Sequence, residues 1–487
     1  MKNFITACCL LAVASMSAHA QVTVTTGANT QPFKLEKKQP SFNAFSNASA
    51  DYFFIKRVQN FENINTMIVA DKSGSIKTLK DIRIERGTFT DNADVKTIIV
   101  TASKTGAFIE RRTKSANKSS LTVRTVDDNG NVGTDEPVGD IDFTKFSNPG
   151  DWYVALTPDK KHVAILAQLP HEKNTPDQFK YFFLDENFKE ISKGQLSFSG
   201  DTKKIPVFNF LASDKGDLYL IAEEFDNSYK YPVVYKVAAG ATGTSIYQVT
   251  APDPSLRNYS YTASVNSAGD LILAGYTQQK RTFSAGDVAT MGTWLFNSSK
   301  PTQVKTFPFD KPIITLTARN IVYNGDTFFL VGEQYKEDKE ASSMAAMQRA
   351  PFDENFTYTH GDIQVTAFSN DGAKKFDITV SRNKWTASNF DESLMVASGT
   401  INNKLALVFN DQYGKYFNDY REIKNYKLPV AVLINNDGLM DAPANFVKEL
   451  NSRSSYYTLY PQFFNANNGR VTVLMGTNEG IKTEIFK

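Results

Sequence analysis

The sequence predicts an all-β fold built from one repeated unit, and two observations support this. Aromatic residues make up 12% of the 487 residues, with 36 Phe and 21 Tyr, and these residue types favour strands. Along most of the chain, a turn cluster of Asn, Asp, Gly or Ser also recurs before four to six apolar or β-branched residues. Because each run is apolar at consecutive positions, we expect strands that are buried on both faces.

The spacing of these runs predicts the architecture. They begin at residues 52, 97, 163, 218, 271, 328, 405 and 471, and seven of them are followed by a second turn cluster such as Asp127-Asp128-Asn129-Gly130. Two β-sandwiches in tandem would also show frequent turns, but the long period and the lack of a linker disfavour them. We therefore predict a single β-propeller with eight four-stranded blades, or seven as the alternative because the copy at residue 52 is weak.

The two ends of the repeat region predict how the ring closes. The last unit has only three strand-like segments, at 459–464, 471–475 and 481–486, before the chain stops. At the other end, the segment 33–37 is a spare strand in front of the first complete unit. We expect this N-terminal strand to complete the C-terminal blade.

Residues 1–20 resemble a secretory signal peptide. Lys2 precedes a short apolar stretch, and Ala18-His19-Ala20 is a small-x-small cleavage site, so the mature chain should begin at Gln21. Both cysteines, Cys8 and Cys9, lie in this leader. The sequence before Cys8 resembles a lipoprotein processing site, but the apolar stretch in front of it is too short to favour lipidation. We expect an exported protein without disulfides, in the periplasm, on the outer surface or outside the cell.

The mature chain divides into an expected flexible arm at 21–31 and a propeller domain at 32–487. Residues 336–350 are rich in Glu, Lys, Ala, Met and Gln and precede Pro351, so they predict a helical insertion.

Composition and motifs exclude several classes of function. The formal net charge of +2 does not favour nucleic acid as a partner, and no apolar run in the mature chain is long enough to span a membrane. His162, His171 and His360 are not at metal-ligand spacing, and nucleophile-elbow and P-loop motifs are absent. We assign no catalytic residue, metal or cofactor.

Polar and aromatic residues at the ends of the buried runs are candidates for a binding site. In a propeller the loops after these strands converge on one rim of the central channel, where ligands commonly bind. The candidates at this position are Glu223, Tyr276, Glu333, Tyr335 and Asp411. Glu223 and Glu333 could also perform acid–base chemistry on a glycosidic bond, whereas the simpler interpretation is that they cap strand ends and face water.

A second group of candidates lies in the aromatic segment 411–427. Tyr413, Tyr416, Tyr420 and Arg421 are residue types that commonly anchor interfaces, although such a loop can also pack on its own aromatic side chains.

The segment Gly361 to Gly372, in which apolar residues alternate ahead of Asp371-Gly372, resembles the outer-strand repeat of uncharacterised secreted bacterial β-propeller proteins. The resemblance implies a repeat fold and transfers no catalytic residues. The favoured hypothesis is an exported, non-enzymatic propeller that binds a protein, peptide or glycan at the cell envelope. The alternative is a secreted polysaccharide hydrolase or lyase that uses carboxylates at the channel rim.

Overall fold

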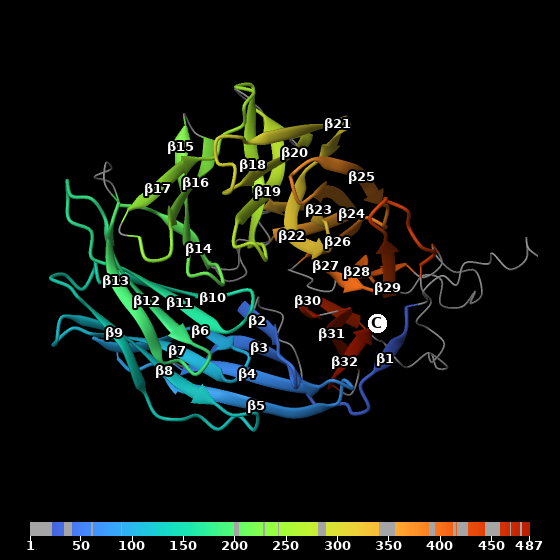
Figure 1. The fold of residues 1–487 in the computed structure, drawn as a ribbon. Coiled ribbons are helices and arrows are strands. Elements are labelled where there is room, and N and C mark those ends of the chain that lie inside the picture. Colours follow the sequence, from blue (N-terminus) through green and yellow to red (C-terminus); the bar gives the residue numbers. More distant parts are fainter. Residues whose placement is uncertain are drawn as a thin grey trace, which may run out of the picture.

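The computed structural model describes residues 22–33, 41–59, 62–88, 90–198, 204–226, 229–241, 243–280, 289–339, 356–388, 395–412, 415, 427–443, 458–467, 469–477 and 480–487. The described residues contain strands and no α-helix, and they form eight antiparallel sheets in a ring (Figure 1). None of them forms a helix long and apolar enough to cross a membrane.

The first four blades follow one another along the chain. Blade 1 contains β2 (Ser41–Ser46), β3 (Ala50–Gln59), β4 (Glu62–Asp71) and β5 (Ile76–Glu85). Blade 2 contains β6 (Asp91–Val100), β7 (Thr105–Thr113), β8 (Lys118–Val126) and β9 (Glu136–Asp142). Blade 3 contains β10 (Asp151–Leu156), β11 (His162–Gln168), β12 (Gln178–Asp185) and β13 (Glu190–Ser197). Blade 4 contains β14 (Val207–Ala212), β15 (Leu218–Asp226), β16 (Tyr229–Val237) and β17 (Thr244–Gln248).

The other four blades complete the ring. Blade 5 contains β18 (Leu256–Val265), β19 (Leu271–Gln279), β20 (Ala289–Asn297) and β21 (Lys305–Ile314). Blade 6 contains β22 (Leu316–Asn324), β23 (Thr327–Lys339), β24 (Phe356–Ser369), β25 (Lys374–Val380) and β26 (Trp385–Ser388). Blade 7 contains β27 (Val396–Ile401), β28 (Lys404–Gln412) and β29 (Lys427–Ile434) within the described residues. Blade 8 contains β30 (Thr458–Asn467), β31 (Arg470–Thr477), β32 (Gly480–Phe486) and, at its outer edge, β1 (Val24–Thr26).

Hydrophobic burial between blades explains why the sequence runs are apolar on both faces. Eight apolar clusters are found among the described residues, one between each pair of adjacent blades. In β3, Tyr52 and Phe54 face blade 2, whereas Phe53 and Ile55 face blade 8. Alternate side chains of such a run therefore fill two different cores, which favours apolar residues at consecutive positions.

The predicted eight-bladed propeller is confirmed, including the weak first copy, and one strand assignment is wrong. Seven of the runs lie in the second strand of their blade, but the run at Thr97 lies in the first strand, β6. The second strand of blade 2 begins at Thr105, which changes the adjoining steps from 45 and 66 residues to 53 and 58 (105 − 52 and 163 − 105).

Closure by an N-terminal strand is also confirmed, but by a different segment than we predicted. β1 pairs with β32 through Val24↔Phe486 to Thr26↔Glu484, inside the segment expected to be a flexible arm (Figure 1). Of the expected strand at 33–37, Phe33 is not in a strand and the rest lies outside the described residues. An outermost strand can be held by backbone hydrogen bonds even where its sequence is polar. The polar residues around Val24 therefore did not indicate a strand.

The expected helix at 336–350 is wrong at its first four residues. They belong to β23, which continues to Lys339 and pairs with β24 there. Residues 340–350 lie outside the described residues.

Candidate functional site

The order of the strands defines two faces of the ring. Turns between first and second strands, and between third and fourth strands, lie on one face, which we call the base. The ends of the second strands and the connections between blades lie on the other face, which we call the rim. The candidates in the second strands and the segments after them therefore belong to the rim.

Some polar rim residues hold the ring together. The Gln168 side chain donates to the backbone carbonyl of Ile205 at 3.0 Å, in the connection to blade 4. The Asn410 amide donates to the carbonyl of Leu459 at 2.9 Å and accepts from its N–H at 3.3 Å. Both amide side chains are buried, so they join successive blades and do not face a ligand.

Glu333 is fully buried at the end of the β23 core segment, surrounded by three basic side chains. Its carboxylate accepts from Arg319 Nε at 2.9 Å and contacts His360 Nδ1 at 2.8 Å. Arg382 Nη2 also donates to it. The aromatic ring of Tyr335 lies beside this cluster, with its centre 4.8 Å from the Arg319 guanidinium carbon and 5.1 Å from the His360 ring.

This environment is unsuitable for acid–base catalysis by Glu333. Burial alone would raise the pKa of Glu333, but the charges of Arg382 and Arg319 and the contact with His360 lower it well below its ordinary value of 4.5. A carboxyl group held ionised in this way is a poor proton donor, and its side chain has no exposed surface through which it could reach a substrate. The alternative that Glu333 faces water is wrong as well.

Tyr276 and Asp411 are also buried. Tyr276 belongs to the core between blades 5 and 6, and burial raises its pKa strongly. Asp411 accepts from the N–H of Asn383 at 3.1 Å and from the indole of Trp385 at 3.3 Å, and so positions the chain after Arg382. These two predicted rim residues therefore support the fold. Tyr413, Tyr416, Tyr420 and Arg421 lie outside the described residues.

Glu223 is the predicted carboxylate that lies at an accessible surface. Its oxygens accept from Lys230 Nζ at 2.8 Å and from the Tyr261 hydroxyl at 3.4 Å. Lys230 also lies 5.7 Å from the centre of the Phe225 ring, and the Tyr261 ring lies 5.6 Å from that of Phe208. These contacts link the five side chains into one group across blades 4 and 5, which we call the aromatic rim patch.

Two of the rings in this patch are unusually exposed for phenylalanine. Phe208 is 58% exposed and Phe225 is 67% exposed. Phe208 is the extra residue of a β-bulge, because Val207 pairs with Ala222 while Asn209 already pairs with Ile221. The sequence offers no signal for this bulge, so Phe208 was missed, whereas Phe225 could have been noticed two positions after Glu223.

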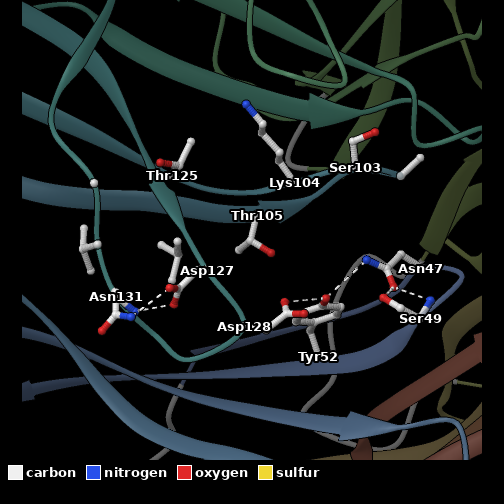
Figure 2. A pocket seen from close by; sticks show the side chains of 14 residues that line it. Asn47, Ser49, Tyr52, Ser103, Lys104, Thr105, Thr125, Asp127, Asp128 and Asn131 are labelled. Atoms are coloured by element: carbon white, nitrogen blue, oxygen red, sulfur yellow. Dashed lines mark hydrogen bonds between the residues drawn. The ribbon is translucent and has the colours of Figure 1, made fainter.

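A polar groove on the base was also missed. It has a volume of about 550 Å³ and lies between the first turn of blade 1, which carries Asn47 and Ser49, and the two turns of blade 2. Figure 2 shows Lys104, Thr105 and Thr125 around this groove, and Asp128, which accepts from the Tyr52 hydroxyl at 2.8 Å. The turn residues were recognised in the sequence, but their approach across two blades depends on the closed ring.

The described residues contain no group of three His, Cys, Asp or Glu side chains that could hold a metal ion. No family model matches the sequence, and no curated protein sequence matches it.

Several solved structures follow a similar course of the chain, and one of them is described as a β-propeller. The β-propeller domain of the Trilobed protease from Pyrococcus furiosus is 7% identical with a TM-score of 0.39, covering 84% of this chain and 96% of that one. Oligogalacturonate lyase from Vibrio parahaemolyticus is 9% identical with a TM-score of 0.33, covering 80% and 95%. Acylaminoacyl peptidase from Pyrococcus horikoshii is 9% identical with a TM-score of 0.37, covering 90% and 58%. These likenesses concern the fold alone.

Proposed function

We propose that this chain is a non-enzymatic binding propeller whose aromatic rim patch takes a protein or peptide partner. The observation that carries the proposal is the exposure of Phe208 and Phe225 on either side of the Glu223–Lys230 ion pair. Exposed aromatic rings beside a charged pair supply large apolar area together with directional contacts, as interface anchors do. A glycan is the other class of ligand that such rings could accept.

The arrangement of the carboxylates disfavours the enzymatic alternative. Acid–base hydrolysis of a glycosidic bond needs two carboxyl groups that both face the substrate. Glu333 is enclosed by Arg319, Arg382 and His360, and Glu223 is engaged by Lys230 and Tyr261. This arrangement of Glu223 and Glu333 supports binding over hydrolysis.

We place this function at the cell envelope because of the leader at residues 1–20. A chain exported through such a leader would meet its partner in the periplasm, on the outer surface or outside the cell. Mass spectrometry of the exported protein tests this part, and it should find an N-terminus at Gln21.

The binding proposal is tested by comparing capture of envelope proteins by the wild-type chain and by the double variant Phe208→Ala, Phe225→Ala. Each captured protein is then purified and titrated against both chains. Loss of the two rings should weaken the binding of the true partner by about 2 kcal/mol or more, which is about thirtyfold in affinity.

The matched control is the double variant Ile246→Ala, Leu439→Ala, which removes two exposed apolar side chains on blades 4 and 7 away from the patch. It should bind the partner as tightly as the wild-type chain. Equal binding by all three proteins would contradict the role of the patch, and specific binding of a polysaccharide in place of any protein would contradict the partner class.

A further inference from the structure

Two basic side chains pair with one buried carboxylate on the base, at the seam between blades 8 and 1. Lys72 Nζ donates to Asp51 Oδ1 at 3.1 Å and to Ser46 Oγ at 3.0 Å. Arg470, from the second strand of blade 8, donates to the other oxygen of Asp51. Asp51 has no exposed side-chain surface, whereas the Lys72 side chain is 30% exposed.

Lys160 adds a further positive charge from blade 3. Its ammonium group donates to the backbone carbonyl of Ser46, the residue whose hydroxyl accepts from Lys72. Within the described part of the chain, Asp51 is the one carboxylate that forms an ion pair with any of these three basic side chains. Three positive charges therefore share one negative charge, and the two lysines meet at Ser46.

The titration behaviour of the lysines agrees with this excess of positive charge. Burial lowers the pKa of Lys160, and the charge of Lys72 lowers it further, against a smaller opposite effect of Asp51. Burial likewise lowers the pKa of Lys72, and Arg470 adds to that effect while Asp51 opposes it. An anion placed between the two ammonium groups would relieve this repulsion.

The polar groove shown in Figure 2 adjoins residues that these lysines contact. Asn47 in its wall directly follows Ser46, and the N–H of Ala102 in the opposite wall donates to the backbone carbonyl of Lys160 at 2.8 Å. Lys104 lines the groove as a further cation. Asp127, at the far wall, is engaged by the N–H groups of Asn129 and Asn131 within its own turn.

We propose that the base carries a binding site for a small, hydroxyl-rich molecule with an anionic group, such as a sugar that bears a phosphate or a carboxylate. The anionic group lies between Lys72 and Lys160 over Ser46. The hydroxyl groups lie in the adjoining groove, where Ser103, Thr105 and Thr125 provide matching donors and acceptors. This site is on the face opposite to the aromatic rim patch and does not depend on it.

Isothermal titration with four probes tests the proposal: glucose 6-phosphate, glucuronate, glucose and inorganic phosphate. Glucose 6-phosphate or glucuronate should bind more tightly than glucose, and which of the two binds better identifies the anionic group. The acidic sugar should also bind more tightly than inorganic phosphate because the groove contributes. Its affinity should fall as the salt concentration rises, since the contact is between charges.

Lys160→Met should lower the affinity for the acidic sugar by about tenfold or more. Lys215→Met is the matched control, because Lys215 occupies a first turn in blade 4 and donates to the carbonyl of Ala268 at 2.5 Å. It should leave the affinity unchanged within about twofold. Absence of binding, equal binding of glucose, or equal weakening by both variants would overturn the site. Equal affinity for inorganic phosphate and glucose 6-phosphate would overturn the role of the groove.

Discussion

At the residue scale, removal of the Glu333 carboxylate would leave the guanidinium groups of Arg319 and Arg382 without the anion that they share. Arg382 is 4% exposed, and its Nε also donates to the carbonyl of Gly361 at 2.6 Å. We expect Glu333→Gln to lower the free energy of unfolding by about 3 kcal/mol or more, because buried charges lose their partner. Urea unfolding at neutral pH measures this, with Glu223→Gln as the control at an accessible ion pair.

The same variant should change how stability depends on pH. The folded pKa of Glu333 is lowered, so its stabilising contribution is fully present above the unfolded value of 4.5 and is lost as the pH falls through the lower folded pKa. The stability difference between wild type and Glu333→Gln should therefore shrink below about pH 4.5. A difference that stays constant down to pH 3 would contradict the assigned ion pairs.

The sequence predicted the place of Glu333 in the fold but not its chemistry. A carboxylate after an apolar run is equally consistent with a buried position and with an exposed strand end. Its burial depends on His360 and Arg382, which lie 27 and 49 residues further along the chain. Contacts over such separations exist only after the third strand of blade 6 and the segment beyond the fourth have folded back.

At the element scale, β-bulges recur in the innermost strands. The extra residues are Lys96 in β6, Phe208 in β14, Ser260 in β18 and Arg319 in β22, each opposite the middle of the second strand. Three of these side chains reach the first strand of the next blade. Lys96 pairs with Asp151 at 2.8 Å, Phe208 packs on Tyr261, and Ser260 accepts from the N–H of Ala318 at 2.9 Å. Bulges thus aim side chains across the gaps between blades.

Ser260→Ala should test this linking role. Loss of the hydroxyl leaves the Ala318 N–H without its acceptor, and we expect a decrease of about 1–2 kcal/mol in the free energy of unfolding. Ser299→Ala, which removes a hydroxyl from an exposed turn, should change it by less than about 0.5 kcal/mol. Equal effects of the two substitutions in chemical denaturation would show that the bulge does not join the blades.

Turns were predictable from the sequence and bulges were not, for a physical reason. A turn such as Asp71 to Gly74 uses a glycine with a φ of 86° and an Asp71 carboxylate that accepts from nearby N–H groups, so its chemistry is local. A bulge at Phe208 or Ser260 satisfies the packing of a neighbouring blade instead. The residue type at a bulge shows no local preference, so the sequence does not indicate where a bulge occurs.

At the scale of the whole molecule, two sets of hydrogen bonds add to the apolar core between blades 8 and 1 in closing the ring. β1 joins β32, and the Asn29 side chain exchanges hydrogen bonds of 2.7 and 2.9 Å with the backbone of Ile76 in blade 1. On the base, Asp51 of blade 1 accepts from Arg470 and Thr472 of blade 8. The N-terminal segment therefore joins the first and last blades.

Deletion of residues 22–30 should expose the edge of β32 and lower the free energy of unfolding by about 3 kcal/mol or more, with increased aggregation. The substitution Thr25→Ala, at an exposed position of β1, should change it little. Gly27→Ala is a point test of the same closure, because its Cβ would lie 2.1 Å from the backbone oxygen of Gly74. A deletion that melts at the wild-type temperature would contradict closure through β1.

The number of blades was predictable because the repeat is carried by buried second strands, each of which needs the same apolar pattern. The closing strand was not, since β1 is only three residues long and is held partly by backbone contacts, continued next to it by Thr23 N–H to Lys487 O at 2.8 Å. In the aromatic rim patch, Glu223 was predicted and Phe225 could have been, whereas Phe208 and Tyr261 meet across two blades.

Binding without turnover through the aromatic rim patch is tested most directly by titrating the purified partner into the wild-type chain and analysing the recovered partner by mass spectrometry. We predict saturable binding with one partner per chain, an unchanged partner mass after prolonged incubation, and about thirtyfold weaker binding by the Phe208→Ala, Phe225→Ala variant. Cleavage of the partner, or undiminished binding by the folded double variant, would contradict the assignment.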